Sequence, residues 1–120
     1  VYQTDGSHLQ ASFATRNRMY GEGADPKTIT RYAVEKFQGY SPFWVGHHAA
    51  FIYDHGAAIS KLKHDTLILT NSGDSINEDA RLAARMRPDF AFEELDGGGV
   101  DIVDQLPEAW ADVVAAFVKG

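Results

Sequence analysis

A carboxylate and a glycine-rich loop stand at corresponding points of two successive stretches of the sequence. Asp74 closely follows the apolar run 66–70 (TLILT), and the glycines 97–99 closely follow the run 90–95 (FAFEEL). A carboxylate held just beyond a buried strand can orient a histidine that acts as a general base and can stabilise its imidazolium. No histidine follows the glycines, because the next residue is Val100. The two stretches therefore carry a carboxylate and a glycine-rich loop, and neither is followed directly by a histidine.

Asp74 also has a simpler interpretation. In the loop 71–74 (NSGD), an aspartate can cap the helix that follows, and this is the commoner role of such a residue when only the local pattern is considered. The glycines 97–99 lack the lysine and the G-x-G-x-x-G context of a phosphate-binding loop, so a tight turn is the better interpretation. We therefore expect no cofactor.

Three histidines gather in one short segment. His47, His48 and His55, with Asp54, invite a metal-site hypothesis, but their spacing contains no i, i+4 pair of ligands, and we expect no metal. Histidine titrates near neutrality, so His47 and His48 are further candidates for proton transfer. The aromatic residues around them are candidates for lining a substrate cavity: Phe43, Trp44, Phe51 and Tyr53.

The composition is that of a globular protein. The chain has 120 residues, of which 44% are hydrophobic and 12% aromatic, and this is enough apolar material for one domain with a core. Its net charge of -6 argues against nucleic acid or an anionic membrane surface as a partner. It has no cysteine and no apolar run of the roughly 20 residues that span a membrane. We expect a cytoplasmic protein with a small-molecule or protein partner.

The first half of the chain is predicted to be helical. Capping residues and apolar spacing predict a helix capped by Asp5 or Ser7 and ending near Tyr20, and a second that starts at Asp25-Pro26 and runs through Phe37. A third is expected from about 42 to 53, ended by the pair at 55–56. Short helices rich in aromatic residues are typical of a lid over another element.

The second half follows an α/β pattern. The runs 66–70 and 90–95 predict adjacent parallel strands, joined by a helix over 77–87, and the first run is typical of a strand covered on both faces. A last helix begins near Pro107. Its apolar stripe is predicted to pack on the sheet: Leu106, Trp110, Val113, Val114 and Phe117. Two parallel strands do not make a stable sheet, so further strands must come from elsewhere.

This pattern resembles the C-terminal portion of an α/β-hydrolase, with 1–61 as the helical lid and 62–120 as the last two strand-helix units of the core. The matching stretches are LKHDTLILTNSGDSI, RPDFAFEELDGGG and DQLPEAWADVVAAFV. In that family, the loop after the penultimate strand carries the triad acid, and a glycine loop after the last strand carries the histidine. The resemblance implies that Asp74 is the triad acid and that Val100 stands where the histidine normally stands. Asp101 is a further candidate base, one position along.

The resemblance also implies that part of the domain lies outside these residues. The nucleophile elbow Gly-x-Ser-x-Gly occurs nowhere in the 120 residues, and the chain opens on Val1 rather than methionine. We expect a fragment or processed chain whose N-terminal half, or a partner chain, covers the sheet. Residues 1–120 alone are then expected to be inactive and not to form an autonomous monomer.

Three functions remain open at this point. The first is a lidded α/β-hydrolase-type enzyme acting on a small apolar or aromatic ester, lactone or related carbonyl compound. The second, favoured by Val100, is a catalytically degenerate protein of the same fold that binds a small molecule or a protein partner. The third is a small α/β interaction domain that dimerises through the exposed edge of its sheet.

Overall fold

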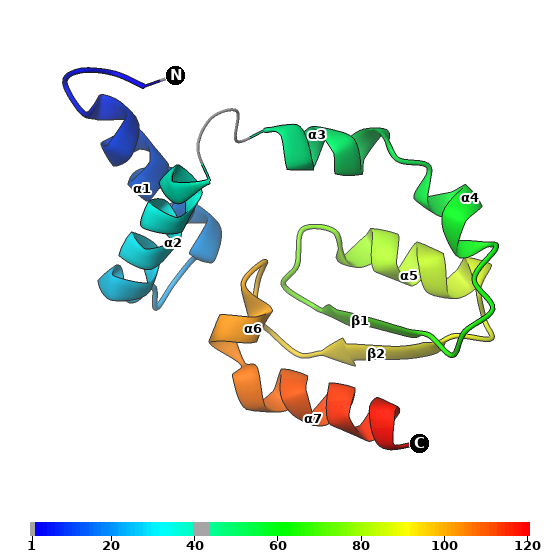
Figure 1. Ribbon diagram of the computed structural model, residues 1–120. Coiled ribbons are helices and arrows are strands. Elements are labelled where there is room, and N and C mark those ends of the chain that lie inside the picture. Colours follow the sequence, from blue (N-terminus) through cyan, green and yellow to red (C-terminus); the bar gives the residue numbers. More distant parts are fainter. Residues whose placement is uncertain (1, 40–43) are drawn as a thin grey trace. The chain divides into compact units, whose positions relative to one another are not determined.

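The computed structural model describes residues 2–39 and 44–120, and the chain divides into two compact units. The first unit is Val1–Tyr53 and the second is Asp54–Gly120. The first unit is helical, whereas the second contains both helices and strands (Figure 1). The protein therefore has mixed α/β architecture, as the sequence predicts.

Helices α1 (Ser7–Tyr20) and α2 (Pro26–Gln38) pack together in the first unit. Asp25 caps α2 as predicted, because its Oδ2 accepts a hydrogen bond of 2.9 Å from the Thr28 amide. The expected cap of α1 is wrong. The N-cap is Gly6 in a left-handed conformation (φ 75), and the Asp5 carboxylate instead accepts from the Ser7 amide in the turn before the helix.

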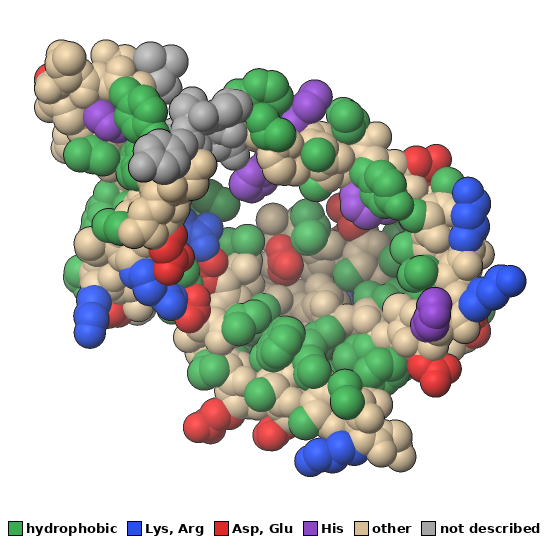
Figure 2. Space-filling view, viewed as in Figure 1, with side chains coloured by type: hydrophobic (Ala, Val, Ile, Leu, Met, Phe, Trp, Pro, Cys, Tyr) green, Lys and Arg blue, Asp and Glu red, His purple; other side chains and the backbone are tan. Residues whose placement is uncertain are grey.

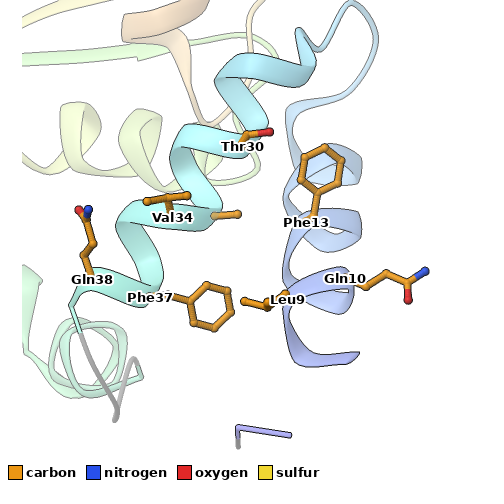
Figure 3. Close-up of a pocket in the computed structure, with 8 residues that line it drawn as sticks. Leu9, Gln10, Phe13, Thr30, Val34, Phe37 and Gln38 are labelled. Atoms are coloured by element: carbon orange, nitrogen blue, oxygen red, sulfur yellow. The ribbon is translucent and has the colours of Figure 1, made fainter. Parts of the chain in front are cut away.

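The buried centre of the first unit is small. Ile29 of α2 is fully buried, as its place on the apolar side predicts. A groove of about 600 Å³ opens between α1 and α2, and Leu9, Phe13, Val34 and Phe37 line its apolar walls (Figure 3). The two helices thus leave part of their apolar surface uncovered.

Two shorter helices follow. Helix α3 (Val45–Ile52) lies within the expected third helix, whose predicted start at 41–42 is outside the described residues. Helix α3 ends close to the predicted position 53, but the expected break at 55–56 is wrong in one respect, because a further helix, α4 (His55–Ile59), begins there. Its cap is Asp54, whose Oδ1 accepts a hydrogen bond of 2.9 Å from the Ala57 amide. The capping carboxylate supplies the acceptor that a glycine-containing helix of this length needs.

The second unit contains the predicted parallel pair. Strands β1 (Leu67–Asn71) and β2 (Ala91–Leu95) are hydrogen-bonded in parallel, in a register that pairs Leu67 with Ala91 and Asn71 with Leu95. Helix α5 (Asn77–Met86) connects them. This arrangement confirms the strand-helix-strand prediction within one or two residues at each boundary.

Helices cover both faces of this small sheet. Thr70 and Glu94 face α5, since the side chains of Asn77 and Arg81 on that helix bond to them. Helix α7 (Pro107–Lys119) lies on the opposite side (Figure 1), preceded by α6 (Ile102–Gln105), which the sequence analysis did not predict. The second unit is therefore a three-layer helix-sheet-helix arrangement.

Coverage of the sheet is only partial. Strand β1, expected to be covered on both faces, has a single helix on each face, which covers it only in part. Leu67 to Leu69 are half-buried, and only Thr70 and Asn71 are buried. Among the described residues, Phe90 and Ile29 are the only buried hydrophobic side chains. Hydrophobic side chains gather on the surface between α7 and the sheet (Figure 2). The described residues add no third strand at either edge.

Arg87 fixes the segment that leads into β1. Its guanidinium donates to the carbonyl oxygens of Ile59 and Leu62 and to the carboxylate of Asp89, and it lies 3.9 Å from the centre of the Phe90 ring. The hydrogen bond from Arg87 lowers the pKa of Asp89.

No helix in the described part of the chain combines the length and apolar character needed to cross a membrane.

Candidate functional site

The carboxyl ends of β1 and β2 lie side by side and carry the residues singled out by the sequence. We call residues 72–76 the acid turn and residues 96–99 the glycine loop. The acid turn begins where the Ser72 amide donates a hydrogen bond of 2.9 Å to the Leu95 carbonyl oxygen. In an α/β sheet this end is where ligands usually bind, because the loops that follow the strands converge there.

The acid turn and the glycine loop touch through their backbones. The Gly73 amide donates to the Gly97 carbonyl oxygen over 3.4 Å. A Cβ atom at Gly73 would lie only 1.8 Å from the carbonyl oxygen of Gly98. Gly98 itself has φ +65, which side chains rarely allow. Glycine is therefore required on both sides of this contact.

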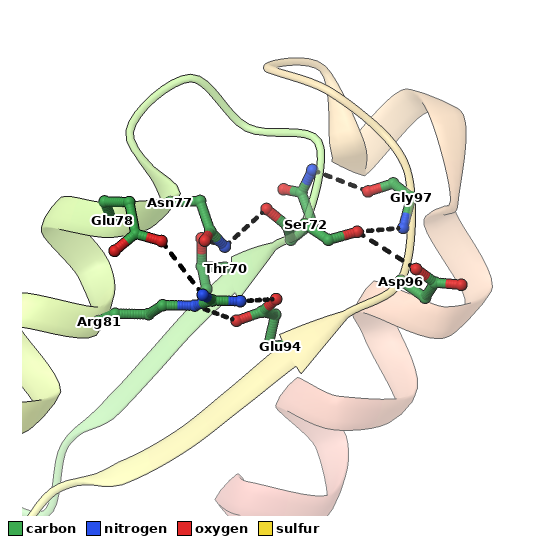
Figure 4. Close-up of polar contacts among 9 residues, drawn as sticks. Thr70, Ser72, Asn77, Glu78, Arg81, Glu94, Asp96 and Gly97 are labelled. Carbon is green, nitrogen blue, oxygen red and sulfur yellow. Dashed lines mark hydrogen bonds and ion pairs between the residues drawn. The ribbon is translucent and has the colours of Figure 1, made fainter.

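Polar side chains tie the two loops together. The Asn71 amide group, on a residue only 1% exposed, donates from Nδ2 to the carbonyl oxygens of Gly97 (3.0 Å) and Gly99 (3.2 Å). The Ser72 hydroxyl accepts from the Gly97 amide over 2.8 Å and donates to Asp96 over 3.2 Å (Figure 4). From α6, the side-chain oxygen of Gln105 accepts a hydrogen bond of 2.6 Å from the Gly99 amide.

Sequence reasoning missed these three positions as functional candidates. Their partners include main-chain atoms as many as 28 residues away along the chain, and local spacing does not reveal such contacts. One signal was present, because Asn71 is a polar residue directly after an apolar run of strand length. A buried amide at the end of a strand needs partners, and the neighbouring loop is the natural source.

Asp74 is half-buried in the acid turn. Its Oδ1 accepts a hydrogen bond of 3.1 Å from the Ile76 amide, while its carbonyl oxygen accepts from the Asn77 amide. The N-cap of α5 is Ile76, so Asp74 shapes the turn before the helix and is not its cap. Among the described residues, Oδ2 of Asp74 receives no hydrogen bond, and it remains available to a partner.

Val100 follows the glycine loop directly and is 46% exposed. It stands two residues after Gly98. The backbone of Gly98 contacts Gly73, which directly precedes Asp74. The structure therefore brings together the two loops that the sequence singled out. Asp101 is half-buried, and its carbonyl oxygen accepts from the Asp104 and Gln105 amides at the start of α6.

The predicted residues of the helical segment belong to the first unit. His47 and His48 are exposed on α3, and the ring centres of Trp44 and His48 lie 5.4 Å apart. Phe51 and Tyr53 are exposed as well, and Phe43 lies outside the described residues. Asp74 and Val100 belong to the second unit, so a site shared with these side chains stays a prediction.

No family model, curated protein or solved structure matches this chain. The assignment of a function therefore rests on the residues and their geometry. Within residues 2–39 and 44–120, no three or more histidine or acidic side chains gather in a way that could hold a metal ion. What the geometry offers is a carboxylate whose Oδ2 accepts no hydrogen bond from the described residues, next to a loop that several hydrogen bonds hold in place.

An ion pair secures the helix that follows the acid turn. Arg81 of α5 donates to both carboxylate oxygens of Glu94 on β2, at 2.9 and 2.8 Å, and also pairs with Glu78 at 3.1 Å (Figure 4). The hydrogen bonds and charge of Arg81 lower the pKa of Glu94 below its ordinary value. The pair thereby links α5 to the strand that leads into the glycine loop.

We expect this pair to make stability depend on pH. Because the pKa of Glu94 is lower in the folded than in the unfolded chain, its contribution is complete above the unfolded value of 4.5 and is lost as the pH falls through the folded value. Urea midpoints of the wild type should therefore fall on acidification below about pH 4.5 more steeply than those of Arg81→Gln. Equal slopes would show that the pair contributes nothing to stability. Arg85→Gln, on the same helix, is the matched control.

Proposed function

We propose that this chain is the C-terminal part of a lidded α/β-hydrolase-type enzyme that acts on a small apolar or aromatic ester, lactone or related carbonyl compound. The observation that carries the proposal is the backbone contact of Gly73 with Gly98 at the carboxyl ends of two adjacent parallel strands. It brings the turn with a partly free carboxylate, Asp74, against the loop from which residue 100 emerges. In a catalytic triad the acid and the base occupy such neighbouring positions.

The layering of the second unit supports a larger sheet. Parallel strands are stable when both faces are covered and neighbours continue the sheet. Helices α5 and α7 supply the faces, while the described residues supply no further strand. We propose that further strands come from another part of the same protein or from a partner chain, and that the helical segment 1–61 serves as the lid.

The chain's own residues would take limited parts in the reaction. Asp74 would orient a base and stabilise its positive charge, and the rigid glycine loop would hold residue 100 opposite it. Val100 cannot accept a proton, and the nucleophile must come from outside these 120 residues. Turnover should therefore be about 10³-fold or more below that of a complete triad, unless His47, His48 or Asp101 supplies proton transfer.

A second function is favoured by the surface around position 100. Val100 and Ile76 are 46% and 58% exposed on the two loops at this end of the second unit. Exposed aliphatic side chains at a ligand-binding edge suit an apolar ligand that is held without being turned over. A binding protein of hydrolase-type fold is therefore the alternative proposal.

A panel of activated esters and lactones separates the two proposals. The longest natural chain that contains these residues should hydrolyse at least one of them, and Asp74→Asn should lower kcat about tenfold or more, because the residue that supplies proton transfer in place of a histidine at position 100 loses the charge that stabilises it. Asp79→Asn, an exposed acid on α5, is the matched control and should leave kcat unchanged. Binding of apolar esters without turnover would favour the binding protein. Fast turnover that Asp74→Asn leaves unchanged would contradict the placement of the acid.

A further inference from the structure

Asn71 bonds to both loops of the candidate site at once. Its side-chain amide donates to Gly97 and Gly99, while its main-chain carbonyl oxygen accepts from the Asp74 amide over 3.1 Å. The same carbonyl oxygen accepts a hydrogen bond of 2.9 Å from the side chain of Asn77. Among the described residues, no other side chain joins the end of β1 to two carbonyl groups of the glycine loop.

The residue type suits this task. An asparagine amide has two N–H donors on one nitrogen, and the two carbonyl oxygens that it meets flank Gly98. Gly98 is held in the left-handed region between them, at φ +65. A carboxylate or an aliphatic side chain in this buried position would leave both carbonyl oxygens without these donors.

We propose that Asn71 is the positioning residue of the candidate site, and that it holds the glycine loop so that residue 100 stands opposite Asp74. This inference rests on the proposed function for the role of Asp74. We call the two hydrogen bonds from the Asn71 side chain to Gly97 and Gly99 the clamp, and the clamp does not depend on that function. Asn71 touches no reacting group and acts through the loop. Without the clamp the fold can persist, while the relation between residue 100 and Asp74 is lost.

The pKa of a histidine introduced at position 100 reports directly whether residue 100 lies near the carboxylate of Asp74. In Val100→His, the imidazole should titrate at about 7.5, above its ordinary value of about 6.5, because a nearby carboxylate favours the imidazolium. Three other carboxylates lie nearby in the sequence: Asp96 in the glycine loop, Asp101 at the N-cap of α6, and Asp104 within α6. Adding Asp74→Asn should return the value to about 6.5, and adding Asp101→Asn should not. Histidine NMR of the longest natural chain, with labelled imidazoles, measures each value.

The clamp is tested by a matched pair of alanine variants in the Val100→His background. Asn71→Ala removes the donors to the glycine loop, and we expect the imidazole pKa to return to about 6.5. Asn77→Ala removes a buried amide that bonds to Thr70 and to the Asn71 carbonyl oxygen but not to the glycine loop, so the raised value should remain. A merely structural role would make the two variants behave alike.

The outcomes separate the clamp from the proposed function. A raised value that survives Asn71→Ala but falls with Asp74→Asn would overturn the clamp and leave the acid in place. A value that Asp74→Asn does not change would contradict the proposed function. In that case the clamp is tested by amide hydrogen exchange in variants that keep Val100. Asn71→Ser should speed exchange at the Gly97 and Gly99 amides at least tenfold more than Asn77→Ala does. Equal exchange would overturn it.

Discussion

Val100→His should raise ester hydrolysis by the longest natural chain that contains these residues about 10²-fold or more, since a positioned general base commonly contributes 10²–10⁴-fold. The new imidazole would stand directly after the glycine loop, which contacts the turn that carries Asp74. The measurement is kcat/KM on the best ester of the panel. The increase should appear mainly in kcat, because proton transfer belongs to the transition state.

The control is a histidine on a neighbouring valine. Val103→His places the same side chain on α6, at a position that is 52% exposed compared with 46% for Val100. It should leave kcat/KM unchanged within about twofold, since no resemblance or contact assigns position 103 to the base. Equal gains from the two substitutions would show that an added imidazole anywhere on this surface suffices.

Gly73→Ala should destabilise the protein by about 3 kcal/mol, which is at the upper end of the usual cost of overpacking. The new Cβ atom would lie 1.8 Å from the Gly98 carbonyl oxygen, so one of the two backbones must move. Movement there disturbs the hydrogen bonds of Asn71 to the glycine loop. Urea unfolding gives the free-energy difference.

Gly99→Ala is the control within the same loop. Its Cβ atom would meet the Gln105 side chain at 3.6 and 3.7 Å, which is ordinary van der Waals contact. We expect a change of no more than about 0.5 kcal/mol, as for a substitution without a clash. Similar losses for the two variants would mean that the close approach of the loops is not what makes Gly73 necessary.

Much of the fold could be predicted because it follows from local chemistry. Asp25-Pro26 supplies a cap and a first-turn proline, and α2 begins there. The two apolar runs of strand length are separated by a helix, and a connection of this kind is typical of parallel neighbours, which is how the two strands pair. Local signals of this kind do not depend on what the rest of the chain does.

The parts that could not be predicted depend on contacts between distant residues or on competing local choices. The glycine loop is held by Asn71 across 26 and 28 residues of chain, and no periodicity encodes that bond. At Gly6, a left-handed glycine replaces the polar caps that were available on either side of it. At 55–56, the cap provided by Asp54 outweighs the tendency of glycine to end a helix.

The candidate site contains features that the sequence predicts and features that it does not. Asp74 and Val100 were singled out by their places after two strands, and parallel strands necessarily bring those places to one end of the sheet. The direct contact of Gly73 with Gly98 was not foreseen, because only the three-dimensional register reveals it. The assignment of His47 and His48 to the same site involves the other unit and stays a prediction.

The central claim is that Asp74 and residue 100 act as a pair. A double-mutant cycle of Val100→His and Asp74→Asn, read as kcat/KM on one activated ester, measures their coupling directly. The claim predicts that Val100→His increases kcat/KM about 10²-fold when Asp74 is present and less than about tenfold when residue 74 is asparagine. The same increase in both backgrounds would contradict it.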